Sequence, residues 1–98
     1  MVQIKWTIQA KNDLREIAEY ISKDSRKYAK LQILRITSRT GILKSQIYSG
    51  KIVNEINQQN IRELLEGNYR IIYKIVEPKR IDILTIHHSA RDLYKRKI

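Results

Sequence analysis

Residues 61–91, with the sequence IRELLEGNYRIIYKIVEPKRIDILTIHHSAR, decide the fold of this chain. Two turn signals, Gly67 with Asn68 and Pro78 with Lys79, divide them into three stretches rich in Ile, Leu, Val and Tyr. Glycine and asparagine tolerate the positive φ angles of a tight hairpin, and proline rarely continues a central strand. The pattern therefore predicts an antiparallel meander. Apolar residues on both faces of its middle strand place that strand at the centre of a sheet.

The residues before this meander predict one strand and a first helix. In VQIKW, residues 2–6, apolar and polar side chains alternate, which is the pattern of a strand with one buried face. Thr7 can cap the helix that follows, because its hydroxyl can accept a hydrogen bond from the first turn. Apolar residues then recur at helical spacing among charged ones over residues 8–22.

A second helix is expected after Asp24 and Ser25, which can cap its first turn. Its apolar stripe runs as far as Ile47, but Gly41 should weaken or end the helix near that point. The stretch KIVNEI, residues 51–56, then predicts a further strand. The expected fold class is α+β, in which an N-terminal strand and a helical hairpin pack on a twisted, mostly antiparallel C-terminal sheet.

The length and charge of the chain indicate a single domain that binds acidic partners. Its 98 residues are enough for one domain, residues 1–98, with a basic tail over about residues 92–98. The formal charge is +10, from 20 Lys and Arg against 10 Asp and Glu. No apolar run approaches the roughly 20 residues that span a bilayer, and the N-terminus lacks the apolar region of a signal peptide. We therefore expect a cytoplasmic protein without a membrane partner.

The sequence contains no cysteine, which excludes disulfides, thiolate zinc ligands and a thiol nucleophile. The adjacent His87 and His88 come closest to a metal-binding pair, but neighbouring residues on a strand point to opposite faces of the sheet. Neither a metal nor a cofactor is expected.

Basic and imidazole side chains of the meander suggest a polyanion site at one end of the sheet. A hairpin about Pro78 and Lys79 sets Arg70 opposite His87. A guanidinium that holds a phosphate and an imidazole that transfers a proton are the groups needed to cleave a ribose phosphodiester. The candidate catalytic residues are Arg70, His87, His88, Arg91 and Tyr94, and the candidate nucleic-acid or target-binding residues are Arg62, Arg70, Arg91, Lys95, Arg96 and Lys97.

Each of these residues also has a purely structural interpretation. Arg70 can pair with Glu63 or Glu66 on the neighbouring strand, and the histidines can be strand-end residues with satisfied hydrogen bonds. Tyr69 and Tyr73 are expected to pack in the core or across strands rather than stack on bases. The cationic tail can be a solvated chain end that adds only sequence-independent attraction to phosphate.

Four stretches together resemble the RelE/ParE superfamily of type II toxin–antitoxin toxins: WTIQAKNDL at 6–14, EYISKDS at 19–25, IRELLEGNYRIIYKI at 61–75 and ILTIHHSAR at 83–91. The similarity covers almost the whole chain, in the family's order of one strand, two helices and a C-terminal meander. The succession of R-E-L, Y-R-I-I-Y and I-L-x-I-x-H-x-x-R is characteristic of these toxins.

The resemblance implies one of two targets. Relatives similar to RelE cleave messenger RNA in the ribosomal A site with a cluster of basic residues and Tyr or His, whereas relatives similar to ParE inhibit DNA gyrase. Arg70, Arg91 and the histidines keep the ribonuclease alternative open. Glu63, however, stands where RelE-like enzymes have basic residues. The long hairpin, the D-S-x-x-Y-A element at 24–29 and R-E-L are more similar to ParE, which favours a gyrase-directed toxin.

The family also implies a cognate antitoxin, whose acidic and amphipathic C-terminal segment wraps the toxin and neutralises it. The second helix has a wide apolar surface, which either packs within the fold or stays partly available to another protein. Its expected antitoxin contacts are Tyr28, Leu31 and Leu34. Operator DNA is expected to be contacted only through the antitoxin. A third alternative is an inactive member that binds its antitoxin and modulates operator binding.

Overall fold

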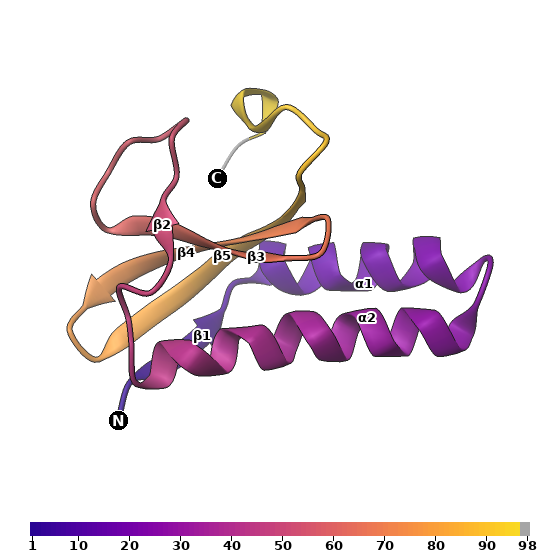
Figure 1. Ribbon diagram of the computed structural model, residues 1–98, viewed down its shortest axis with the longest axis horizontal. Coiled ribbons are helices and arrows are strands. Elements are labelled where there is room, and N and C mark those ends of the chain that lie inside the picture. Colours follow the sequence, from indigo (N-terminus) through magenta and orange to yellow (C-terminus); the bar gives the residue numbers. More distant parts are fainter. Residues whose placement is uncertain (97–98) are drawn as a thin grey trace.

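Two layers make up the fold in the computed structural model, which describes residues 1–96: a helical hairpin and a five-stranded sheet (Figure 1). The hairpin consists of α1 (Ile8–Ser22) and α2 (Arg26–Arg39), and the 3-10 helix η1 (Thr40–Lys44) continues α2. The strands are β1 (Gln3–Trp6), β2 (Lys51–Ile52), β3 (Ile61–Glu66), β4 (Tyr69–Glu77) and β5 (Arg80–His88). A second 3-10 helix, η2 (Leu93–Lys95), follows β5.

The sheet has the strand order β1-β5-β4-β3-β2, with β4 at its centre. β1 pairs with β5 in parallel, and the other neighbouring strands are antiparallel. The α+β fold class, the mostly antiparallel sheet and the central position of β4 are therefore confirmed.

Both helices begin where their caps were predicted. The Thr7 hydroxyl accepts a hydrogen bond from the N–H of Ala10 at 3.1 Å, and the Ser25 hydroxyl accepts one from Tyr28 at 3.1 Å. α2 ends at Arg39, before Gly41, so the apolar stripe that continues to Ile47 does not extend the α-helix. There the chain tightens into η1.

The two predicted hairpins form the meander, and the β4–β5 register shifts twice, between Ile75 and Glu77 and between Ile72 and Tyr73. Gly67 has a φ of +57° in the turn between β3 and β4, a conformation that glycine adopts without steric cost. Pro78 and Lys79 connect β4 to β5. Arg70 lies directly opposite His87 in the β4–β5 pair, as predicted.

The strand predicted at residues 51–56 is shorter than expected, because only Lys51 and Ile52 pair with β3. The chain then turns back at Val53, whose carbonyl accepts hydrogen bonds from the N–H groups of Ile56 at 3.1 Å and Asn57 at 2.7 Å. Asn57 has a φ of 55°, which asparagine tolerates better than most residues. A tight turn thus replaces the second half of the predicted strand.

Hydrophobic clusters cover both faces of β4. The larger cluster packs between the sheet and the helices and includes Ile71, Tyr73, Ile83 and Ile36. The smaller one, on the other face, joins Ile72 to Val53 and Leu93. Tyr73 is fully buried, and its hydroxyl donates to the carbonyl of Ile47 at 2.8 Å. Its predicted core role is confirmed.

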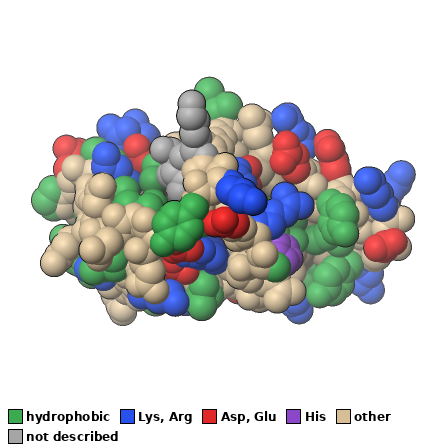
Figure 2. Space-filling view, turned by 90° about the horizontal axis from the view of Figure 1, so that it is seen from above, with side chains coloured by type: hydrophobic (Ala, Val, Ile, Leu, Met, Phe, Trp, Pro, Cys, Tyr) green, Lys and Arg blue, Asp and Glu red, His purple; other side chains and the backbone are tan. Residues whose placement is uncertain are grey.

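The C-terminal segment folds back onto the sheet. Leu93 is buried in the smaller cluster, and Arg96 forms an ion pair with Asp13 of α1. The expectation of a solvated tail at Lys95, Arg96 and Lys97 is therefore wrong for Arg96, which pairs with Asp13, whereas Lys95 is exposed. Lys97 lies outside the described residues. The remaining cationic side chains are spread over the surface rather than gathered in one stripe on the face that Figure 2 shows.

Candidate functional site

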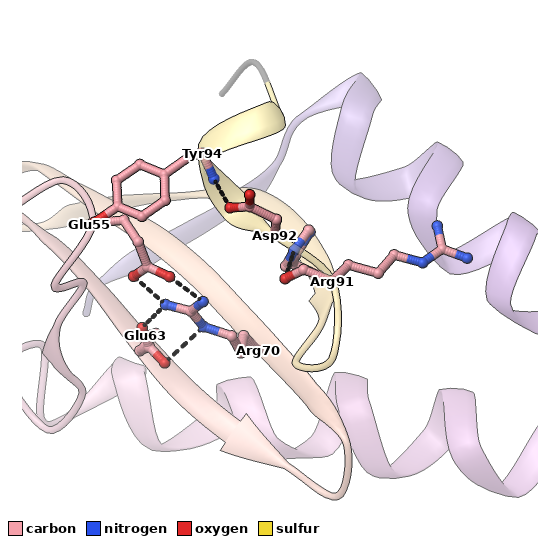
Figure 3. A network of polar contacts seen from close by, with 7 residues as sticks. Glu55, Glu63, Arg70, Arg91, Asp92 and Tyr94 are labelled. Carbon is pink, nitrogen blue, oxygen red and sulfur yellow. Dashed lines mark hydrogen bonds and ion pairs between the residues drawn. The ribbon is translucent and has the colours of Figure 1, made fainter.

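Arg70 of β4 is the centre of an ion-pair cluster with two carboxylates (Figure 3). Its guanidinium donates to Glu63 from Nε at 3.0 Å and from Nη2 at 2.6 Å. It donates to Glu55 from Nη1 at 2.7 Å and from Nη2 at 2.8 Å. Leu65 faces Arg70 across the β3–β4 pair, so Glu63, two residues earlier, is its diagonal neighbour on the same face.

The cluster is largely removed from solvent. The side chain of Arg70 is 12% exposed, that of Glu63 3% and that of Glu55 20%. Hydrogen bonding to Arg70 lowers the pKa of the Glu55 carboxyl to about 2, and the two carboxylates raise the pKa of Arg70 above its usual value. Two carboxylates thus neutralise the guanidinium, and their four hydrogen bonds with it engage all three of its nitrogens. Of the two structural partners considered for Arg70, the structure selects Glu63 and adds Glu55.

The two histidines lie on opposite faces of β5. His87 is buried on the face of Arg70, and its Nε2 donates to the carbonyl of Arg91 at 3.0 Å. Its Nδ1 has no hydrogen-bond partner among residues 1–96. His88 lies across from Tyr69, and the two rings meet edge to face at 5.4 Å. The Nδ1 of His88 accepts a hydrogen bond from the N–H of Ala90 at 3.1 Å.

The other cationic candidates do not converge on Arg70. Arg62 donates to the carbonyls of Gly50 and Gln59, each at 3.0 Å, and stacks on the ring of Tyr48. Arg91 extends away from the Arg70 cluster toward the helices (Figure 3). Lys95 is exposed on η2, and Arg96 is paired with Asp13. The structure therefore does not bring these cations together as one polyanion site.

Tyr94 lies beside the Arg70 cluster. Its side chain is exposed, and it lines a cavity of about 460 Å³ together with Arg70, Glu55 and Lys51. The cavity combines a phenol and a lysine, which pairs with no carboxylate within residues 1–96, with an arginine whose charge is already compensated. Such a site offers little to a phosphate beyond Lys51.

An apolar groove lies along the two helices of the hairpin. Its volume is about 600 Å³, and Ala18, Ala29, Ile33 and Leu34 line it with the cations Arg26 and Lys30. We call it the hairpin groove. Leu34 is 61% exposed, and Tyr28 and Leu31 are also exposed but do not line the groove. The wide apolar surface of α2 is thus divided: Ile36 packs inside the fold, and Leu34 remains available.

The sequence did not indicate that two residues, Glu55 and Asp13, would take part in the polar networks. Glu55 reaches Arg70 from an irregular loop, and Asp13 reaches Thr85 and Arg96 from a helix position that looked solvent-facing. Within residues 1–96, no group of three or more His, Asp or Glu side chains is arranged to hold a metal ion. Neither helix in this part of the chain is long and apolar enough to cross a membrane.

Two helices packed on a five-stranded mixed sheet that begins with an N-terminal strand are the architecture of RelE/ParE superfamily toxins. The family described as "ParE toxin of type II toxin-antitoxin system, parDE" matches residues 4–93. The chain therefore belongs to the ParE toxin family, and it is the toxin of a type II toxin–antitoxin module.

Solved structures share this fold. The chromosomal ParDE toxin–antitoxin system from P. aeruginosa is 25% identical over 90% of this chain and 96% of that chain, with a TM-score of 0.73. The RelBE2 toxin–antitoxin complex from Mycobacterium tuberculosis is 20% identical over 89% and 96% of the two chains, with a TM-score of 0.62. The E. coli DinJ-YafQ complex is 20% identical over 92% and 96%, with a TM-score of 0.51. No curated protein matches the chain.

Proposed function

We propose that this toxin inhibits DNA gyrase and that a cognate antitoxin neutralises it by binding the helical hairpin. The observation that carries the choice of target is the double carboxylate pairing of Arg70. A ribonuclease of the RelE type needs a cation that can hold the scissile phosphate. Here Glu55 and Glu63 neutralise the central cation on the face of the sheet away from the helices, which supports a target that is a protein rather than an RNA phosphate.

The hairpin groove supports the antitoxin half of the proposal. Its walls are aliphatic, and its cations, Arg26 and Lys30, outnumber its single acid, Glu19. An amphipathic segment with an apolar stripe and flanking carboxylates complements both features. The net charge of +10 would also accelerate the encounter with an acidic partner.

The target is tested with purified components. Gyrase supercoiling and the gyrase–DNA cleavage complex are measured over a titration of toxin, and translated messenger RNA is probed for cleavage in parallel. Inhibited supercoiling with intact transcripts is the expected result. Codon-phased cleavage of translated messages with unaffected gyrase would instead establish the ribosome-dependent ribonuclease, and Arg70, His87 and Tyr94 would become the first catalytic residues to mutate. If the toxin affects neither gyrase nor messenger RNA but still binds its antitoxin, the remaining alternative is an inactive member that modulates operator binding through the antitoxin.

The antitoxin surface is tested by calorimetry with the full-length antitoxin. Leu34→Glu places a charge of the antitoxin's own sign in the groove, so we expect the dissociation constant to rise at least about tenfold. Ile8→Glu is the matched control, because Ile8 is also an exposed aliphatic residue. It lies at the N-terminal end of α1, whereas the groove is lined by residues near the C-terminal end of that helix. Equal affinities for the Leu34→Glu variant and the wild type would rule out the hairpin groove as the antitoxin site.

A further inference from the structure

A second groove lies where the helices extend past the end of the sheet. α1 and α2 project beyond the turn between β3 and β4, so the inner side of α1 has no strand beneath its C-terminal half (Figure 1). Tyr20 and Ile17 of α1, Tyr69 of β4, His88 of β5 and Arg91 line the cavity that results, which has a volume of about 490 Å³. We call it the aromatic groove.

The spacing of its residues explains how the groove forms. Glu16, Ile17 and Tyr20 recur at intervals of three and four along α1, so they lie on one side of the helix. Tyr69 and His88 are a facing pair at the ends of β4 and β5, on the helix side of the sheet. β1 stops at Trp6, opposite Ile83, and therefore leaves this end of β5 uncovered.

The groove presents side chains that commonly anchor protein partners. Tyr20 is 71% exposed, although it lies on the same side of α1 as Asp13, which is buried against the sheet nearer the start of the helix. Arg91 extends toward the helices (Figure 3), and its guanidinium pairs with no carboxylate within residues 1–96. Tyrosine and arginine are among the residue types enriched at binding hot spots. In Figure 2, hydrophobic side chains gather beside a histidine and neighbouring cations over the projecting half of the molecule.

The charges of the two grooves differ, which indicates different partners. The hairpin groove is aliphatic with a cationic excess, and this suits an acidic antitoxin segment. In the aromatic groove the negative and positive charges balance. Asp13 is paired with Arg96, and the two other charged residues are one acid, Glu16, and one base, Arg91. A uniformly acidic segment would meet Glu16 unfavourably, whereas a folded protein surface of mixed charge would not.

We propose that the aromatic groove is the surface with which the toxin contacts its protein target. The inference rests on the proposed function, with gyrase as that target. A partner residue with an aromatic or aliphatic side chain enters between Tyr20 and Tyr69, and a neighbouring carboxylate of the partner pairs with Arg91. The antitoxin and the target then occupy different grooves of one hairpin, and the antitoxin blocks the target by its bulk beside the aromatic groove.

Two variants test the assignment: Tyr20→Ala removes an exposed ring, and Arg91→Glu reverses a free charge. Their matched controls are Tyr48→Ala, an exposed tyrosine that lines neither groove, and Lys5→Glu on β1. Each protein is titrated against the gyrase holoenzyme in a supercoiling assay and against full-length antitoxin by calorimetry. The antitoxin affinity also reports whether each variant is folded.

We expect Tyr20→Ala and Arg91→Glu to raise the toxin concentration for half-inhibition at least about tenfold while antitoxin affinity changes less than about twofold. Unchanged inhibition by both variants overturns the inference. Loss of antitoxin affinity with inhibition intact also overturns it and assigns the groove to the antitoxin. A wild type that dimerises through this groove, with a monomeric Tyr20→Ala variant, assigns it to a second copy. If the wild type does not inhibit gyrase, the proposed function itself has failed, and the wild-type titration identifies that case.

Discussion

The carboxylate of Asp13 in α1 accepts a hydrogen bond from the backbone N–H of Ile86 in β5, at 3.1 Å. β1 pairs with β5 only as far as Ile83, so this N–H would otherwise lie on an open strand edge. The same carboxylate accepts a hydrogen bond from the Thr85 hydroxyl at 2.5 Å and pairs with Arg96. One buried acid therefore joins the first helix, the uncovered half of β5 and the C-terminal segment.

We predict that Asp13→Ala lowers the free energy of unfolding by about 3–5 kcal/mol, because it leaves two buried donors unsatisfied and Arg96 without its partner. Asp13→Asn keeps one carbonyl acceptor and should lose less. Urea denaturation followed by Trp6 fluorescence measures both changes. Glu16→Ala, an exposed acid on the same helix, should stay within about 0.5 kcal/mol of the wild type. Equal effects of Asp13→Ala and Glu16→Ala would show that the Asp13 network contributes nothing to stability.

Gly50 lies too close to its neighbours for any side chain. A Cβ atom at this position would stand 2.6 Å from the carbonyl oxygen of Glu63 and 2.7 Å from the hydroxyl of Tyr73. The N–H of Gly50 also donates to the Tyr73 hydroxyl at 3.0 Å. We predict that Gly50→Ala destabilises the protein by about 1–3 kcal/mol, because backbone and a fully buried ring must move.

Gly41 supplies the control for this measurement, since a Cβ there meets no atom within 4 Å. Gly41→Ala should leave the midpoint of thermal unfolding unchanged or raise it slightly, because alanine restricts the unfolded chain. A destabilisation of similar size in both variants would contradict the steric explanation for Gly50.

Local signals in the sequence were enough for the helices and hairpins. Thr7 and Ser25 begin helices because their hydroxyls accept hydrogen bonds within the same first turn, and Gly67 marks a turn by its own φ angle. Counting from the turn at Pro78 and Lys79 places Arg70 opposite His87, and the pair is observed because the two register shifts between β4 and β5 cancel before it.

The partners of the site residues could not be derived in this way. Glu55 approaches Arg70 from a loop that carries no periodic pattern, and Asp13 meets Ile86 across 73 positions of the chain. Leu93 is a single apolar residue among charged ones, so its burial depends on a recess that Val53 and Ile72 form elsewhere. Contacts of this kind depend on how the elements pack, and neither composition nor spacing encodes them.

Leu93 also allows a test of the folded C-terminal segment. We predict that Leu93→Ala lowers the free energy of unfolding by about 2–5 kcal/mol, because it leaves a cavity beside Val53 and Ile72 and loosens the segment that carries Arg96. Hydrogen exchange should show faster exchange at residues 91–96. Tyr94→Ala, which removes an exposed ring next to it, should change stability by less than about 0.5 kcal/mol. If the segment were a solvated tail instead, Leu93→Ala and Tyr94→Ala would both leave the free energy of unfolding almost unchanged.

The Glu55–Arg70 pair should make stability depend on pH in the acid range. The pKa of Glu55 is lowered to about 2 in the folded chain from an ordinary value of 4.5. A carboxyl with a depressed pKa contributes stability that is fully present above its unfolded pKa and is lost as the pH falls through its folded pKa.

The loss therefore falls between about pH 4.5 and pH 2, and because Glu55 is partly exposed we expect it to be on the order of 1–2 kcal/mol. Urea unfolding at several pH values in this window measures it. Glu55→Gln cannot titrate, so its stability should fall less steeply with acid than that of the wild type. Glu77→Gln, at an exposed carboxyl on β4, should keep the wild-type slope. If the slope of Glu55→Gln matched the wild type instead, Glu55 would not be held by Arg70 in solution, and Glu63 alone would neutralise the guanidinium.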